Sequence, residues 1–343
     1  MKMINSITKI VFLIAVVFFT NCTYAQKNIE LEKGAMPDWV TAPYSEYSEQ
    51  KYIVGVGSGD TRKAAEFDAA GNISRVFKSK IEVDETVVEN YLENETELTA
   101  SSEMLKKTSV NSEQELKNII IERAYFSEKQ GVYYVLAYMD RAETARLYKQ
   151  DIGKNNKKIM QHYADFESSD NKLHKFAFLK KALLLTDIND ILNQQFQILT
   201  FGSQVPASVT KNELEKSLME LKDKITVQLV PDAGTPEGVG DYLKEMIGKF
   251  GFKMINGAAD FTFQYGLDVK ETNINRANTE ALSWKLTLRV KDNVNNSTLK
   301  AFNLKKRTVA VSHEEARSRM MLKVQNALSK KFYKKFNNYI LSI

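Results

Sequence analysis

Two segments near the C-terminus alternate strictly between apolar and polar side chains. The apolar members are Phe261, Phe263, Tyr265, Leu267 and Val269 in the first segment, and Trp284, Leu286, Leu288 and Val290 in the second. Successive side chains of a strand point to opposite faces, so this pattern predicts two half-buried strands of an antiparallel sheet. One face of that sheet lies in water, and the other must be covered by further elements of the chain.

The segments around these two strands supply the cover. Residues 225–229 predict a preceding strand, and residues 299–311 predict a third strand after the pair. Helices are expected at 237–250, ending at Gly251, and from Ser312 onward, where Ser312 and Glu315 form a capping box. The second helix turns one apolar face inward: Ala316, Met320, Val324, Ala327, Leu328, Phe332 and Tyr339. Residues 211–343 are therefore predicted to be an α+β domain that folds alone, with its helices on one face.

A second α+β domain is predicted at residues 51–141. A strand at 51–57 leads through Gly55, Gly57 and Gly59 into a helix at 61–80, and we interpret these glycines as a tight strand-to-helix turn. Residues 118–126 and 132–139 predict a hairpin that turns at Gly131. Between the helix and this hairpin, residues 81–91 are interpreted as a strand and residues 93–116 as an exposed helix or long excursion.

Helical spacing continues through residues 142–200, which predict an antiparallel helical hairpin. Leu147, Ile152, Ile159 and Met160 mark its first helix, and Phe176, Leu179, Leu183 and Leu184 its second. A linker is expected at 201–210, and an extended lead-in at 26–50 whose Trp39 docks on the first domain. The predicted fold is α+β: two small domains of helix and sheet layers, joined by the helical hairpin after a cleaved signal peptide.

The N-terminus has the three parts of a secretory signal peptide, assigned to residues 1–25. Lys2 and Lys9 are followed by an apolar run at 10–19 and by a small residue, Ala25, before the expected cleavage at Gln26. Cys22 leaves two interpretations open. Cleavage after Ala25 removes it and gives a periplasmic protein, whereas lipidation of Cys22 anchors the chain to the outer membrane.

Composition narrows the class of protein. The chain of 343 residues has 43% hydrophobic residues, enough for packed cores, and a formal net charge of +5. Its basic residues are not interleaved with aromatic residues on one element, so no nucleic-acid partner is predicted. Cys22 is the only cysteine, and the fold must therefore form without an internal disulfide.

Motifs that carry chemistry are not evident. His162, His174 and His313 have no second histidine or cysteine at metal-ligand spacing. In the segment 55–60, Asp60 replaces the third glycine of a dinucleotide fingerprint, and glycines are missing where a nucleophile elbow needs them. We therefore predict no catalytic, cofactor-binding or metal-binding residue. The acidic run Glu93, Glu95, Glu97 and Glu103 is interpreted as solvated, and Lys330, Lys331, Lys334 and Lys335 as complementing the dipole at the end of the last helix or contacting an anionic envelope surface.

The first domain resembles the LPP20 lipoprotein family of bacterial envelope proteins. The residues that carry the resemblance are Pro37-Asp38-Trp39, the strand 52–57, the alanine pairs 64–65 and 69–70, and the closing strand 132–141. The layer order of residues 211–343 is similar to the amino-terminal domains of TolB and to curli-secretion domains, at the level of fold only.

These resemblances imply a non-catalytic envelope protein that docks or scaffolds other envelope proteins, such as outer-membrane or peptidoglycan-associated proteins. Membrane contact is expected only if Cys22 is lipidated. An accessory subunit of a secretion or motility assembly is the alternative, followed by an enzyme of unknown class.

Overall fold

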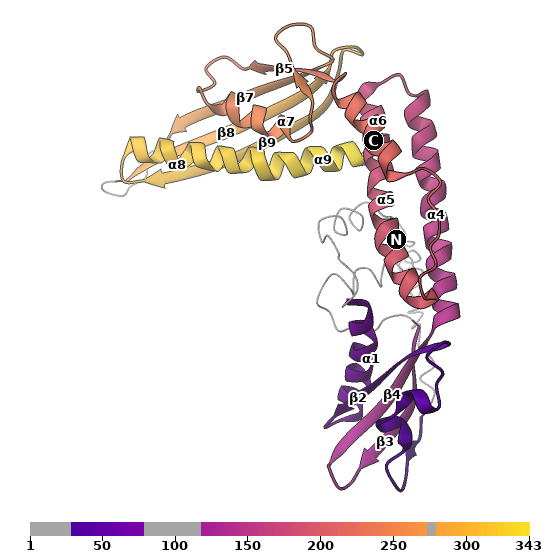
Figure 1. Cartoon of the computed structure of the whole chain (residues 1–343). Helices are drawn as coiled ribbons and strands as arrows, with labels where there is room; N and C mark the ends of the chain where they lie inside the picture. The colour runs from indigo at the N-terminus through magenta and orange to yellow at the C-terminus, as the bar shows by residue number, and fades with distance from the viewer. Residues whose placement is uncertain (1–28, 79–117, 273–278) are drawn as a thin grey trace, which may run out of the picture.

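The computed structural model describes residues 29–78, 118–272 and 279–343. They form an α+β architecture with three parts (Figure 1): a four-stranded sheet at one end, a long helical hairpin, and a five-stranded sheet at the other end. The five-stranded domain extends sideways from one end of the hairpin, so the molecule is L-shaped. The predicted signal peptide, Cys22, the strand at 81–91 and the acidic run lie outside the described residues.

The N-terminal sheet contains four strands in the order β1-β3-β4-β2. Their bounds are Leu31–Glu32 for β1, Tyr52–Gly59 for β2, Ile119–Ser127 for β3 and Val132–Asp140 for β4. The predicted hairpin β3–β4 is confirmed, with Gly131 in the left-handed region at a φ of 68°. Helix α1, Arg62–Lys78, covers one face of this sheet.

The lead-in is part of this domain and is not simply extended. Strand β1 pairs in parallel with β3, and two short 3-10 helices follow, η1 at Asp38–Val40 and η2 at Pro43–Ser45. The expected docking of Trp39 is confirmed, since its side chain is fully buried with Val54, Tyr125 and Leu136. This small second core lies on the face of the sheet opposite α1. Burial of Trp39 in it holds the lead-in against the sheet.

The hairpin consists of α4, Arg141–Ser168, and α5, Lys172–Thr200. Asp140 and Asn171 cap their N-termini by accepting hydrogen bonds from backbone N–H groups. Inside the hairpin, Asn155 donates to Asn189, which in turn donates to Asn156. Each buried amide thus has a polar partner, which fixes the register of the two helices. Met160, one of the residues whose spacing predicts this helix, is 53% exposed.

The linker returns along the hairpin before the C-terminal domain begins. Asn193 exchanges two hydrogen bonds with the backbone of Val205, and Asn156 donates to the carbonyl of Pro206. Helix α6, Lys211–Lys222, follows and packs on α5 through the buried Leu214, Leu218 and Leu221. This helix was not predicted, although Thr210 and Glu213 form a capping box that indicates its N-terminus.

The C-terminal sheet has the order β6-β5-β7-β8-β9. Its strands are β5 Thr226–Pro231, β6 Lys253–Met254, β7 Phe261–Glu271, β8 Glu280–Asp292 and β9 Ser297–Ala310. The antiparallel pairing of β7, β8 and β9 is as predicted, whereas β5 joins β7 in parallel after the crossover helix α7, Val239–Gly248. The last helix runs as α8, His313–Asn326, a π-helical segment η3, Ala327–Phe332, and α9, Tyr333–Ser342. Together with α7 it covers one face of the sheet, as expected.

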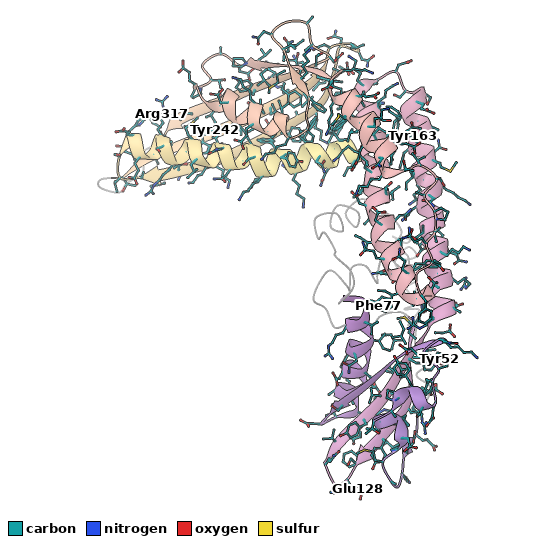
Figure 2. The ribbon with its side chains drawn as sticks, in the orientation of Figure 1. Tyr52, Phe77, Glu128, Tyr163, Tyr242 and Arg317 are labelled. Atoms are coloured by element: carbon teal, nitrogen blue, oxygen red, sulfur yellow. The ribbon has the colours of Figure 1, made fainter. Side chains whose placement is uncertain are left out.

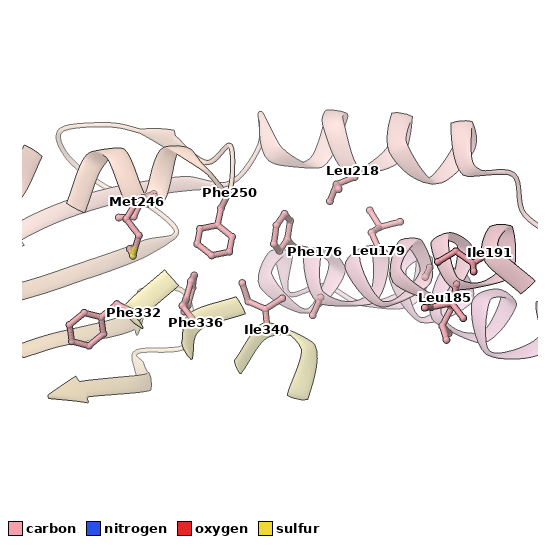
Figure 3. Packing of buried hydrophobic residues seen from close by; sticks show 14 of the residues in the cluster. Phe176, Leu179, Leu185, Ile191, Leu218, Met246, Phe250, Phe332, Phe336 and Ile340 are labelled. Atoms are coloured by element: carbon pink, nitrogen blue, oxygen red, sulfur yellow. The ribbon is translucent and has the colours of Figure 1, made fainter. Parts of the chain in front are cut away.

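One hydrophobic core continues from the hairpin into the C-terminal domain (Figure 3). The ring of Phe176 on α5 lies 4.9 Å from the ring of Phe252 and 6.5 Å from that of Phe250. Phe250 in turn packs 5.2 Å from Phe336 on α9. Sequence patterns predict that residues 211–343 fold alone, and in the structure their core is continuous with that of the hairpin.

Polar contacts reinforce this junction. Asn171 donates to Asp292 at 2.9 Å, and the Lys172 ammonium lies 2.8 Å from the Asp260 carboxylate. Burial raises the pKa of Asp260, but hydrogen bonds from Lys172 and Thr226 outweigh it and hold the pKa below its usual value. The N-terminus of α5 is therefore tied to the ends of β7 and β8.

Candidate functional site

The three glycines of the first domain lie inside strand β2 and not in a turn, which corrects the interpretation of Gly55, Gly57 and Gly59. Their role is to let helix α1 touch the strand. A Cβ atom on Gly57 would lie 2.1 Å from the backbone nitrogen of Ala69, and one on Gly55 would lie 2.4 Å from the Ala69 oxygen. The glycines of β2 therefore form a packing surface for α1.

The histidines are not brought together by the fold. His162 lies on α4 beside Phe178, where burial and then the charge of Lys181 lower its pKa. His174 is exposed near the start of α5, and His313 begins α8 with its Nδ1 atom 3.5 Å from Glu271. Within residues 29–78, 118–272 and 279–343, no group of three His, Cys, Asp or Glu side chains is arranged to hold a metal ion.

The lysines of the last helix lie in its middle. Lys330 and Lys331 belong to η3, and α9 continues for ten residues beyond it. The effect of a helix dipole falls off within the last turn, so these side chains do not complement it. They remain exposed on this helix, which packs against one face of the sheet.

The opposite surface of this domain is a basic sheet face. It is the face of β7, β8 and β9 that carries no helix, and six of its exposed side chains are cationic: Lys270, Lys285, Arg289, Lys291, Lys305 and Arg307. The strand period of two places these residues together, because their neighbours Trp284, Leu286 and Leu288 point into the core. No helix or strand of the described residues packs on this basic sheet face.

Like charges meet across the strands of the basic sheet face. Lys285 on β8 is directly opposite Lys305 on β9, a position in which Cβ atoms lie about 5 Å apart and like charges destabilise a sheet. Among the residues that the structure describes, neither lysine has an ion-pair or hydrogen-bond partner. Asp268 lies opposite Lys285 on the other side, and Asp232 lies 3.8 Å from Arg289, so positive charge remains in excess.

The charge of the whole domain has the same sign. Residues 211–343 contain 23 Lys or Arg residues against 15 Asp or Glu residues, a formal net charge of +8, although the full chain has only +5. The excess is thus concentrated in this domain, and a rigid sheet presents part of it on one surface. Such a surface attracts polyanions and anionic membranes.

The N-terminal domain carries a different surface, made of partly exposed tyrosines. The rings of Tyr52 and Tyr138 lie 5.1 Å apart, and Tyr47 of the lead-in stacks on Tyr138 at 5.6 Å. Burial and the charge of Glu122 raise the pKa values of Tyr47 and Tyr138. All three rings are half-buried, as is common for tyrosines in protein interfaces.

Comparison with known proteins bears on this same domain. Residues 37–140 match the model of the LPP20 lipoprotein family. The match contains the glycine strand β2, the tyrosine surface and helix α1, and it confirms the resemblance seen in the sequence. The LPP20 segment supports a location in the bacterial envelope. None of the helices within the described ranges has the length and apolarity needed to cross a membrane.

Solved structures with some likeness include further envelope and secreted proteins. A secreted protein from Helicobacter pylori is 12% identical, with a TM-score of 0.39, and the match covers 81% of this chain and 98% of that one. A minor lipoprotein from Acinetobacter baumannii is 11% identical, with a TM-score of 0.25, covering 34% and 90%. The rare lipoprotein B from Shewanella oneidensis is 12% identical, with a TM-score of 0.23, covering 34% and 91%.

These TM-scores are too low for the fold or function of those proteins to be assigned to this chain. No curated protein matches the chain. The comparisons also do not confirm the likeness of residues 211–343 to TolB and curli-secretion domains.

Proposed function

We propose that this chain is a non-catalytic envelope protein that docks on an anionic lipid surface through the basic sheet face. The observation that carries this proposal is the like-charged pair Lys285 and Lys305, on a sheet face where positive charge is in excess. Like charges held directly opposite each other cost stability, and an anionic partner removes that cost. The LPP20 segment supports the envelope as the place where the partner is found.

The hairpin separates the N-terminal domain from the domain that carries the basic sheet face. Helices α4 and α5 have 28 and 29 residues, so at a rise of 1.5 Å per residue the hairpin is about 42 Å long. Figure 2 shows Glu128 at the far tip of the LPP20 segment and Arg317 at the far end of the C-terminal domain. A protein held by its basic sheet face would keep the tyrosine surface at a distance, available to a protein partner.

The expected strength follows from the number of basic side chains. A basic residue near an anionic membrane contributes about 1 kcal/mol, and the attraction falls off within the Debye length of about 10 Å at 0.1 M salt. The basic sheet face brings several such residues to one plane, whereas scattered surface lysines cannot all approach a membrane together. The interaction should therefore be reversible and sensitive to salt.

Sedimentation with lipid vesicles tests this proposal. Residues 26–343 should bind vesicles that contain phosphatidylglycerol and not vesicles of phosphatidylcholine, and the binding should be lost in 0.5 M salt, roughly where the Debye length falls to a few ångströms. Lys285→Glu with Lys305→Glu should weaken binding by about 30-fold or more, since two cations are lost and two anions are added.

The last helix provides a matched control. Lys330→Glu with Lys331→Glu makes the same change of charge on the opposite side of the domain. This variant should keep most of the binding. If the helix variant loses binding and the sheet variant keeps it, the docking surface has been assigned to the wrong face.

The tyrosine surface favours a second candidate function, a subunit of a larger envelope assembly such as a secretion or motility apparatus. Tyr47, Tyr52 and Tyr138 form a half-buried aromatic patch of the kind that protein interfaces use. Tyr52→Ala would then release the chain from its assembly in cells without changing vesicle binding. Co-purification of the wild-type chain and the variant with crosslinked neighbours distinguishes the two functions.

A further inference from the structure

A cavity of about 590 Å³ lies beside the free part of strand β5. Strand β6 pairs only with Thr226 and Val227, so the following residues of β5 have no strand neighbour on that side. The walls are formed by the loop after β5, the first turn of α7 and the segment after β6. Val227, Leu229 and Met254 make one side of this cavity apolar, and its volume is in the range of small-molecule sites.

The hydroxyl group of Tyr265 is the unusual feature of this cavity. Tyr265 lines the cavity from β7 and is only 9% exposed. Within the described part of the chain, its hydroxyl makes no hydrogen bond. A Cβ atom on Gly240 would lie 2.5 Å from this hydroxyl, so the glycine allows the ring to reach the first turn of α7. The hydroxyl is not sealed from the cavity, so it is available to donate a hydrogen bond to a ligand that enters.

The first turn of α7 adds further donors to the same wall. Its N-cap is Gly238, which has no side chain to accept hydrogen bonds from the free backbone N–H groups. Gly240 and Asp241 in this first turn line the cavity, so the positive end of the helix dipole faces it. Glu237 and Asp241 also line the cavity, but both are exposed to solvent, which screens their charges, and Lys244 lies 2.9 Å from Asp241 and offsets part of its charge.

We propose that this cavity binds an apolar carboxylate. The carboxylate accepts hydrogen bonds from the first turn of α7 and from the Tyr265 hydroxyl, and the apolar group packs against Val227, Leu229 and Met254. The required chemistry is one carboxylate on a branched or linear alkyl group. It is available from the C-terminal residue of a peptide and from a free aliphatic acid. Burial raises the pKa of Tyr265, which keeps its hydroxyl protonated and able to donate.

Saturation-transfer NMR with N-acetyl-leucine tests the site in the intact chain. A probe of this size should bind with a Kd in the millimolar range. Its amide, N-acetyl-leucinamide, should bind at least tenfold more weakly, because it lacks the charge that the helix terminus favours. Tyr265→Phe removes only the hydroxyl and should weaken binding of the acid by about fivefold.

Tyr242→Phe is the matched control, since Tyr242 lies on α7 (Figure 2) and is not one of the residues that line the cavity. It should leave binding unchanged, and unfolding curves should show that both variants are folded. Equal binding of acid and amide, or equal loss in the two variants, would overturn the assignment. Comparison of octanoate with the acid acetyl-Ala-Ala-Leu then identifies the source: tighter binding of the peptide assigns the site to a protein C-terminus, and tighter binding of octanoate assigns it to free aliphatic acids.

Discussion

A Gly57→Val variant is expected to lose most of the stability of the N-terminal domain. The added side chain would meet the backbone of α1, with its Cβ atom 2.1 Å from the Ala69 nitrogen and 2.3 Å from the Ala65 oxygen. Backbone cannot move aside as a flexible side chain does, so the helix must separate from β2. We expect a loss of about 3 kcal/mol or more in the free energy of unfolding, at the upper end for overpacked sites.

Hydrogen exchange measured by mass spectrometry would locate this loss. Protection should fall in β2, α1 and β4 and remain in β7, β8 and α9, which belong to the other end of the molecule. Gly71→Ala is the control within the same helix, because a Cβ atom there has only the Arg75 side chain nearby, at 4.0 Å. That change should stabilise α1 by about 0.5–1 kcal/mol. Equal stability of Gly57→Val and wild type would show that α1 does not rest on the glycines.

Phe176→Ala should destabilise the hairpin and the C-terminal domain together. Phe176 is 1% exposed and joins α5 to Phe250 and Phe252, which belong to the sheet domain. Removal of a buried phenylalanine ring costs about 3–5 kcal/mol. Because the ring lies in a core shared by both parts, exchange should increase in α5 and also in β7 and α9.

Met219→Ala provides the comparison for this junction. Met219 lies on α6, which packs on α5, but it is 69% exposed and its loss should change stability by less than about 0.5 kcal/mol. If Phe176→Ala increased exchange in the hairpin alone, residues 211–343 would have a core of their own, as their sequence pattern predicts. The continuous packing from Phe176 to Phe336 leads us to expect the joint effect.

The sequence predicted elements wherever the side-chain period was regular. Strands β7 and β8 follow from strict alternation, and the turn at Gly131 follows from the need for a positive φ. The glycines of β2 were misplaced because a glycine has no side chain that could reveal which face it occupies. Only the position of α1 above the strand shows that they are contact points. Helix α6 was missed although its capping box is visible at Thr210 and Glu213.

The candidate site depends on pairing between strands, which a single sequence does not specify. Lys285 and Arg289 are recognisable as the polar side of β8, and Lys305 and Arg307 as polar residues of β9. Their meeting on one surface depends on the register that sets Lys285 opposite Lys305. The cavity at Tyr265 likewise requires the parallel crossover from β5 through α7, which brings Gly240 to the tyrosine.

The docking of the basic sheet face on an anionic membrane is tested most directly by fluorescent labels on single cysteines. Residues 26–343 contain no cysteine, so one label reports one position. Asn303→Cys places it on the basic sheet face, Asn326→Cys on the last helix, and Glu128→Cys at the tip of the LPP20 segment, and all three positions are exposed. With vesicles that contain phosphatidylglycerol, a polarity-sensitive label should shift to shorter wavelength at position 303 alone. A shift at position 326 or 128 without one at 303 would contradict the proposed docking.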